Sequence, residues 1–132
     1  MKPFLRVVCG IIQKERRYFI ARRKPEKSLG GYWEFPGGKL EDGEDSVRAL
    51  QRELLEELGM EVQNLNYLDT HQYEYEHFII ELIAFRCDFQ KATFAMIDHD
   101  RGEFVNVHDL KEYKLAPADI YFRDLLISDN KN

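Results

Sequence analysis

A chain of 132 residues is long enough for one hydrophobic core, so the sequence predicts a single domain over residues 1–132. Its net charge of −5 argues against a broad nucleic-acid surface, which would need a basic patch. Hydrophobic residues make up 44% of the sequence, which argues against disorder, and no apolar run approaches the roughly 20 residues of a membrane helix. We therefore expect a protein that has neither nucleic acid nor a membrane as its partner.

The first half of the chain predicts two strands and a helix. Residues 4–13 and 18–22 are rich in apolar residues and predict strands joined by a charged turn. A polar loop follows over residues 24–31, and the Pro-Gly-Gly sequence at 36–38 predicts a tight turn. A helix from about 45 to 58 follows, because apolar residues there recur at spacings of three and four. These residues are Val47, Leu50, Leu54 and Leu58.

The second half predicts more strands and a closing helix. Residues 61–72 and 77–89 predict strands, and the second is apolar enough to lie centrally in a sheet. The remaining segments are a short strand at 93–96, a loop at 98–102, a strand at 103–107, a helical turn at 108–110, a helix at 116–127 and a frayed tail at 129–132. Strands on both sides of one helix, followed by a closing helix, predict an α+β layered domain.

The two cysteines and the start of the chain indicate a compartment. Cys9 and Cys87 each lie inside an apolar run, which predicts buried free thiols in a reducing environment. The first three residues lead directly into a strand pattern without the features of a signal peptide. We therefore expect a cytoplasmic protein.

The predicted helix at 45–58 carries a cluster of acidic residues. Glu53, Glu56 and Glu57 stand at i, i+3 and i+4, so their carboxylates share one face and repel one another by a few tenths of a kcal/mol per pair. A divalent cation among them would explain the cluster. Oxygen ligands without Cys or His favour Mg²⁺ or Mn²⁺ over Zn²⁺, and Mg²⁺ usually also binds substrate phosphates. The alternative is a solvated acidic face with Arg48 and Arg52 as salt-bridge partners.

The segment from residue 38 to 60 resembles the Nudix box, Gly-x5-Glu-x7-Arg-Glu-U-x-Glu-Glu-x-Gly-U, in which U is bulky and aliphatic. All fixed positions are filled, by Gly38, Glu44, Arg52, Glu53, Leu54, Glu56, Glu57, Gly59 and Met60. Residues 22–23, 33–39 and 115–119 also look like segments of MutT-type nucleoside triphosphate pyrophosphohydrolases. The resemblance implies a Nudix α/β/α sandwich, with a mixed sheet between helices.

The resemblance also implies roles for the box residues. The carbonyl of Gly37 and the carboxylates of Glu56 and Glu57 match metal ligands, and Glu53 matches a residue that holds a metal and holds or deprotonates the attacking water. Arg52 would orient a box carboxylate through a charge-assisted hydrogen bond.

Two further acids, Glu44 and Asp98, each have two possible roles. Glu44 is either structural or holds an outer-sphere water. In relatives a carboxylate in the loop at 97–100 often completes the metal site, and Asp98 stands there where Glu is more usual, which shortens its reach. The alternative for Asp98 is a loop acid that caps a turn.

The expected substrate contacts come from outside the helix. Arg23 and Lys39 are candidates to neutralise phosphate oxygens, with surface charge as the alternative. The resemblance places Glu34 near the nucleotide and Asp119 at the position that hydrogen-bonds the base, where a carboxylate accepts from amino and ring N–H groups. The alternative for Asp119 is a helix N-cap. Three aromatic residues are candidates to stack on a base or to belong to the core, namely Tyr73, Tyr75 and Phe78.

These features predict Mg²⁺-dependent hydrolysis of a nucleoside triphosphate to the monophosphate and pyrophosphate, which cleans the nucleotide pool. CTP, dCTP, a methylated cytidine nucleotide and an oxidised purine such as 8-oxo-dGTP remain open as substrates, and a monomer or weak homodimer is expected. The enzyme alternatives are hydrolases of dinucleoside polyphosphates, suggested by the position of Tyr75, or of nucleoside-diphosphate sugars. A third alternative is a non-catalytic Nudix domain that senses a nucleotide, although such domains usually lose box carboxylates.

Overall fold

A mixed sheet forms the centre of the computed structural model, which describes residues 1–130. Five strands follow the order β3-β2-β1-β6-β5, while β4 pairs with β1 and β7 pairs with β2. β1 and β6 are parallel and the other pairs are antiparallel. The strands are β1 (Phe4–Lys14), β2 (Arg17–Arg23), β3 (Trp33–Glu34), β4 (Gly37–Lys39), β5 (Met60–Glu74), β6 (Ile79–Ala92) and β7 (His99–Asn106).

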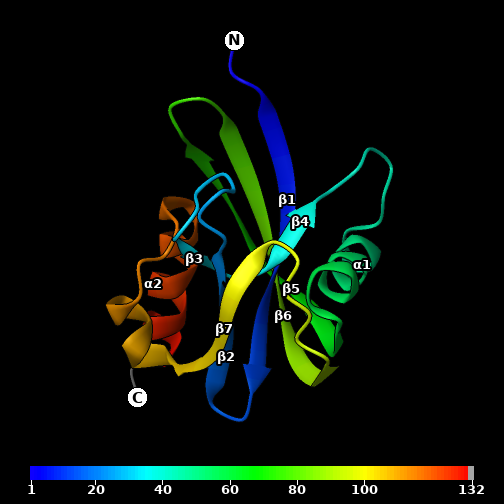
Figure 1. Ribbon diagram of the computed structural model, residues 1–132, viewed down its shortest axis with the longest axis vertical. Coiled ribbons are helices and arrows are strands. Elements are labelled where there is room, and N and C mark those ends of the chain that lie inside the picture. Colours follow the sequence, from blue (N-terminus) through cyan, green and yellow to red (C-terminus); the bar gives the residue numbers. More distant parts are fainter. Residues whose placement is uncertain (131–132) are drawn as a thin grey trace.

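Two α-helices cover opposite sides of this sheet. α1 (Ser46–Leu58) packs on one side and α2 (Ile120–Asp129) lies on the other, with the strands between them (Figure 1). Two short 3₁₀ helices, η1 (Val107–Glu112) and η2 (Pro117–Asp119), lead from β7 into α2. The predicted α/β/α sandwich with a mixed sheet is confirmed. Within residues 1–130, no helix is long and apolar enough to cross a membrane.

The central strand β1 serves two hydrophobic cores at once. Its side chains alternate between the faces of the sheet, so Val8 and Ile12 join the core beneath α1 while Cys9 and Ile11 join the core beneath α2. This strand is buried on both faces, which explains why its sequence is a nearly continuous apolar run. Cys9 and Cys87 are buried free thiols, as predicted.

The ends of α1 follow from capping chemistry. The side chain of Asp45 accepts a hydrogen bond from the backbone N–H of Arg48, and Gly59 ends the helix in the left-handed conformation at φ 57°. Leu50, Leu54 and Leu58 are fully buried on the side facing the sheet. The predicted helix and its apolar stripe are therefore confirmed, while Glu56 is exposed and Glu53 and Glu57 are half-buried.

The predictions for residues 93–102 were wrong. Residues 93–96 form no strand, and Phe94 takes a left-handed conformation at φ 57°. Of the expected loop at 98–102, residues 99–102 are instead the start of β7, which pairs with the whole length of β2. Gly102 lies within β7 and pairs with Ala21, and it is a glycine because a Cβ there would stand 2.6 Å from the ring of Phe19.

The predicted tight turn at 36–38 was also wrong. Gly37 and Gly38 begin the short strand β4 and pair with Cys9 and Val8 of β1. Neither glycine has a positive φ. Gly37 is needed because of close approach, since a Cβ there would lie 1.8 Å from the carbonyl oxygen of Val8.

The other elements differ from the predictions mainly at their ends. The predicted strand at 61–72 is observed as 60–74 and the one at 77–89 as 79–92, while the helical turn at 108–110 lies within η1. The last helix begins as the 3₁₀ turn η2 before α2. Asp129, predicted to begin a frayed tail, is the last residue of α2, and residues 131–132 lie outside the described part.

Candidate active site

The guanidinium of Arg52 gathers three of the acidic side chains predicted to act together. It donates two hydrogen bonds to Glu44, at 3.0 and 3.1 Å, one to Glu53 at 3.0 Å and one to Glu56 at 3.2 Å. These contacts raise the pKa of Arg52, chiefly through the hydrogen bond to Glu44, and the same bond lowers the pKa of Glu44. The planar fork of arginine suits this multiple contact, which holds the carboxylates in fixed directions.

Glu57 lies next to this group but does not contact Arg52. Its Oε2 is buried and has no hydrogen-bond partner within residues 1–130. Burial raises the pKa of Glu57 to about 7, and the nearby Asp98 and Glu53 add to the shift. The charged form of Glu57 is therefore disfavoured in the absence of a nearby positive charge. Burial also raises the pKa of Glu53, although Arg52 opposes that shift.

Asp98 reaches the acidic group from the segment before β7. Its carboxylate pairs with Lys27 at 3.0 Å. Burial raises the pKa of Asp98, but its hydrogen bonds to Lys27 and Glu57 outweigh burial and lower it. The structure thus brings Asp98 beside Glu57, where the sequence had left its position open. Lys27 was not singled out from the sequence, because it lies in a polar loop without a motif.

The donor set fits a hard divalent cation, although the acids do not converge on one point. Within residues 1–130, no three His, Cys, Asp or Glu side chains form a ready-made metal site, and Arg52 occupies one oxygen each of Glu53 and Glu56. Glu57 indicates where a cation would bind. One of its carboxylate oxygens is buried without a partner and its pKa is raised, so a cation nearby would stabilise its charged form. Carboxylate oxygens alone suit Mg²⁺ or Mn²⁺.

A cavity of about 660 Å³ opens beside β4 and brings the predicted substrate residues together. Its wall is built from β1, the loop after β2, residues 34–39, the hairpin between β5 and β6, and the segment before α2. The predicted residues that line it are Arg23, Glu34, Gly37, Lys39 and Asp119. The cavity is next to the acidic group, because a Cβ on Gly38 would lie 2.2 Å from the carboxyl group of Glu53.

Asp119 is buried in the wall of this cavity. It is only 5% exposed, and its Oδ2 accepts a hydrogen bond of 2.8 Å from the backbone N–H of Phe35. Asp119 stands at the N-cap position of α2, as the alternative expected, but its side chain makes no cap hydrogen bond to that helix. Burial raises the pKa of Asp119 well above its usual range, and the charge of Glu34 adds to the shift. A buried carboxyl group with one oxygen already bound is suited to recognise a polar ligand group.

Glu34 lies on the same cavity wall and has two partners. Its Oε2 lies 2.7 Å from Nε2 of His99 and 3.5 Å from a guanidinium nitrogen of Arg23. Arg23 also donates a hydrogen bond of 2.7 Å to the backbone carbonyl of Ser28, so its guanidinium is held between the loop and Glu34. His99 and Glu34 lie 65 positions apart in the chain, so their pairing became visible only in the fold.

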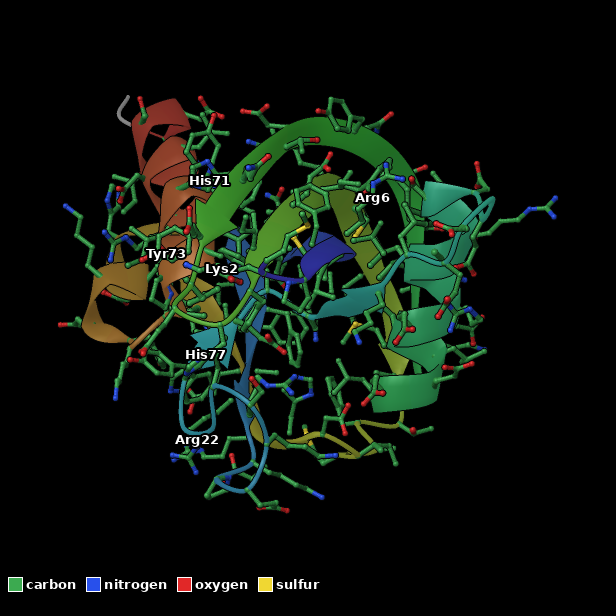
Figure 2. The ribbon with its side chains drawn as sticks, turned by 90° about the horizontal axis from the view of Figure 1, so that it is seen from above. Lys2, Arg6, Arg22, His71, Tyr73 and His77 are labelled. Carbon is green, nitrogen blue, oxygen red and sulfur yellow. The ribbon has the colours of Figure 1, made fainter. Side chains whose placement is uncertain are left out.

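The hairpin between β5 and β6 closes the cavity on another side. The hydroxyl of Tyr75 accepts a hydrogen bond of 3.0 Å from the backbone N–H of Ala118, the residue before Asp119. Burial raises the pKa of Tyr75 to about 12. Lys2 holds the hairpin through Glu74 at 2.6 Å and the carbonyl of Tyr75 at 2.9 Å, and Figure 2 shows Lys2 beside the hairpin that carries His77. Tyr75 therefore forms part of the cavity wall.

Comparison with known proteins agrees with this geometry. The model of the NUDIX domain family matches residues 7–123. The chain is 36% identical to the CTP pyrophosphohydrolase of Escherichia coli over 116 residues, covering 88% of this chain and 86% of that protein. It is 45% identical to the 8-oxo-dGTP diphosphatase of Proteus vulgaris over 75 residues, covering 56% and 67%.

Solved structures show the same fold. The solution structure of the E. coli ORF135 protein has a TM-score of 0.81 at 33% identity, covering 96% of this chain and 91% of that chain. A crystal structure of a MutT protein from Methanosarcina mazei has a TM-score of 0.82 at 22% identity, covering 99% and 98%. From the family match, the relatives and the filled box at residues 38–60, the chain belongs to the Nudix hydrolase family.

Proposed function

We propose that the protein hydrolyses a nucleoside triphosphate to the monophosphate and pyrophosphate with Mg²⁺ as its cofactor. The observation that carries the proposal is the contact between the two parts of the site at Gly38, where the wall of a nucleotide-sized cavity touches Glu53. A nucleotide in the cavity would thereby hold its phosphates beside the acids of α1. The names of the relatives, CTP pyrophosphohydrolase and 8-oxo-dGTP diphosphatase, support the same reaction class.

The carboxylates of Glu53, Glu56 and Glu57 and the carbonyl of Gly37 would hold the metal, with Asp98 beside them. A bound divalent cation neutralises phosphate charge and lowers the pKa of a water molecule. Arg52 keeps the directions of Glu53 and Glu56 fixed through its hydrogen bonds. Carboxylates that are already held in place do not have to reorient during the reaction, which lowers the activation free energy.

The protein residues then position the reacting groups. Arg23 and Lys39 line the cavity and would neutralise phosphate oxygens. Glu53 is the proposed group that holds the attacking water or takes its proton, since it lies against Gly38 at the junction of the cavity and the acids. Phosphoryl chemistry depends mainly on such positioning and charge neutralisation.

The base would be bound at the deep end of the cavity, where Glu34 and Asp119 present carboxyl groups. Cytosine nucleotides and purines with additional N–H groups are therefore the proposed substrates. By hydrolysing them, the enzyme would remove unwanted nucleotides from the pool. The hydroxyl of Tyr75 accepts a hydrogen bond from the backbone N–H of Ala118 in the cavity wall. This use of Tyr75 within the wall supports a cavity for one base over a dinucleotide site.

The proposal is tested by measuring pyrophosphate release from canonical, methylated and oxidised nucleoside triphosphates with Mg²⁺ or Mn²⁺. We expect release of pyrophosphate and the monophosphate, with cytosine or oxidised guanine substrates preferred. Release of orthophosphate, or tight nucleotide binding without turnover, would contradict the proposal and favour a different hydrolase or the sensing domain.

A further inference from the structure

His99 pairs with Glu34 in the cavity wall and lies outside the segment 38–60 that matches the family motif. It is the first residue of β7, and its side chain is only 2% exposed. Nε2 lies 2.7 Å from Oε2 of Glu34, while Nδ1 is buried without a partner within residues 1–130. Because the pairing with Glu34 is the ring's one polar contact there, a loss of His99 acts on Glu34 first.

The pairing leaves Glu34 with one oxygen occupied and the other available. His99 and Arg23 both approach Oε2, and the hydrogen bonds among the described residues leave Oε1 without a donor. The Glu34 side chain is 19% exposed and lines the cavity together with Asp119. Two donors on one oxygen restrict the rotation of the carboxylate, so Oε1 is presented as a fixed acceptor.

We propose that His99 is a positioning residue for base selection, which fixes Glu34 so that Glu34 and Asp119 together accept N–H groups from one edge of a base. The inference rests on the proposed function of the cavity. Cytosine offers the two hydrogens of one amino group, and guanine offers an amino group beside a ring N–H, so both can donate to paired acceptors. Uracil offers a single N–H between two carbonyl groups, and those carbonyls would face the carboxyl oxygens without a hydrogen bond.

Two substitutions at the same position separate the hydrogen bond from the packing. His99→Phe keeps an aromatic ring but removes the N–H donor, whereas His99→Gln keeps a donor. We expect the ratio of kcat/KM for CTP over UTP to fall about tenfold in His99→Phe, and to be largely kept in His99→Gln, since a hydrogen bond to a charged group is worth about a factor of ten or more. His108→Phe, at an exposed position in η1, is the matched control.

A double-mutant cycle tests whether His99 acts through Glu34. Glu34→Gln alone is expected to lower the same ratio, and adding His99→Phe is then expected to change it little further. An unchanged ratio in Glu34→Gln or in folded His99→Phe would overturn the inference. An equal loss of turnover for all nucleotides would also overturn it, because His99 would then act on the acidic group.

Nucleotide binding tests the role of His99 even if the proposed reaction is wrong. If the wild-type protein released no pyrophosphate from any triphosphate, the proposed function would fail, and selection would be measured by calorimetric binding of CMP and UMP. We then expect tighter binding of CMP, with the difference reduced by Glu34→Gln and His99→Phe. Equal binding of CMP and UMP by the wild type would overturn the role of His99.

Discussion

The acidic group on α1 and the cavity beside β4 differ in how the chain assembles them. Most of the acidic group comes from one helix and the turn before it, and Arg52 holds three of its acids within one short stretch of sequence. The cavity is built from segments at both ends of the chain, and Asp119 meets Phe35 across 84 positions. A local motif can thus specify the reaction, whereas selectivity depends on tertiary contacts.

The largest effect is expected from the acidic group. Glu57→Gln should lower pyrophosphate release by about 100-fold or more, because it removes a charged ligand from a site of fixed geometry. It should leave the free energy of unfolding unchanged or raise it, since burial already disfavours the charged form of Glu57. Turnover and urea unfolding measure the two effects. Glu112→Gln, an exposed position in η1, is the control, and wild-type turnover in Glu57→Gln would contradict the proposed role.

A second prediction tests the junction between the two regions. Gly38→Ala should lower kcat by about tenfold or more, because the added Cβ would stand 2.2 Å from the Glu53 carboxyl group and displace it. Gly43→Ala is the comparison, since no atom lies within 4 Å of its Cβ and its φ of 78° costs only stability. Steady-state kinetics of both variants check this. Equal kcat values would show that the position of Glu53 is not critical.

A third prediction addresses the cavity alone. Asp119→Asn should change the ratio of kcat/KM for CTP over UTP by about tenfold, because the amide presents a donor where the carboxyl group presents an acceptor. The fold should persist, since the amide oxygen can still accept from the N–H of Phe35. The Mg²⁺ concentration for half-maximal rate should stay the same. A change in that concentration with an unchanged substrate ratio would assign Asp119 to the acidic group instead.

The smallest effect is a change in the pH dependence of stability. Burial raises the pKa of Asp119 in the folded protein above its value in the unfolded chain, so folding is most favourable below the unfolded pKa and loses stability as the pH rises through the folded pKa. Each pKa unit corresponds to about 1.4 kcal/mol. Urea unfolding between about pH 4 and pH 7 should therefore show a smaller loss of stability in Asp119→Asn. An identical slope would mean that Asp119 does not carry the burial penalty.

Glycine shows where sequence interpretation failed and why. The predicted end of the helix at residue 58 is confirmed, because Gly59 follows it in a left-handed conformation, which is a local property of the chain. Gly37 and Gly102 were predicted in a turn and a loop, yet both lie in strands. Their lack of a side chain is required by the carbonyl of Val8 and the ring of Phe19, which are distant in sequence. Close approach of this kind leaves no local signal.

The sequence by itself determined the layered fold, the helix α1 and the Nudix box, because apolar spacing, capping residues and the order of acids are local patterns. Through resemblance to relatives it also named some of the residues that line the cavity, among them Arg23, Glu34 and Asp119. Only the tertiary structure decided that His99 pairs with Glu34, that Lys27 pairs with Asp98 and that the Asp119 side chain is bound to Phe35 and not to α2. These contacts join segments far apart in the chain. Their energies depend on how deeply the side chains are buried and how close they lie, and both are set only when the sheet folds.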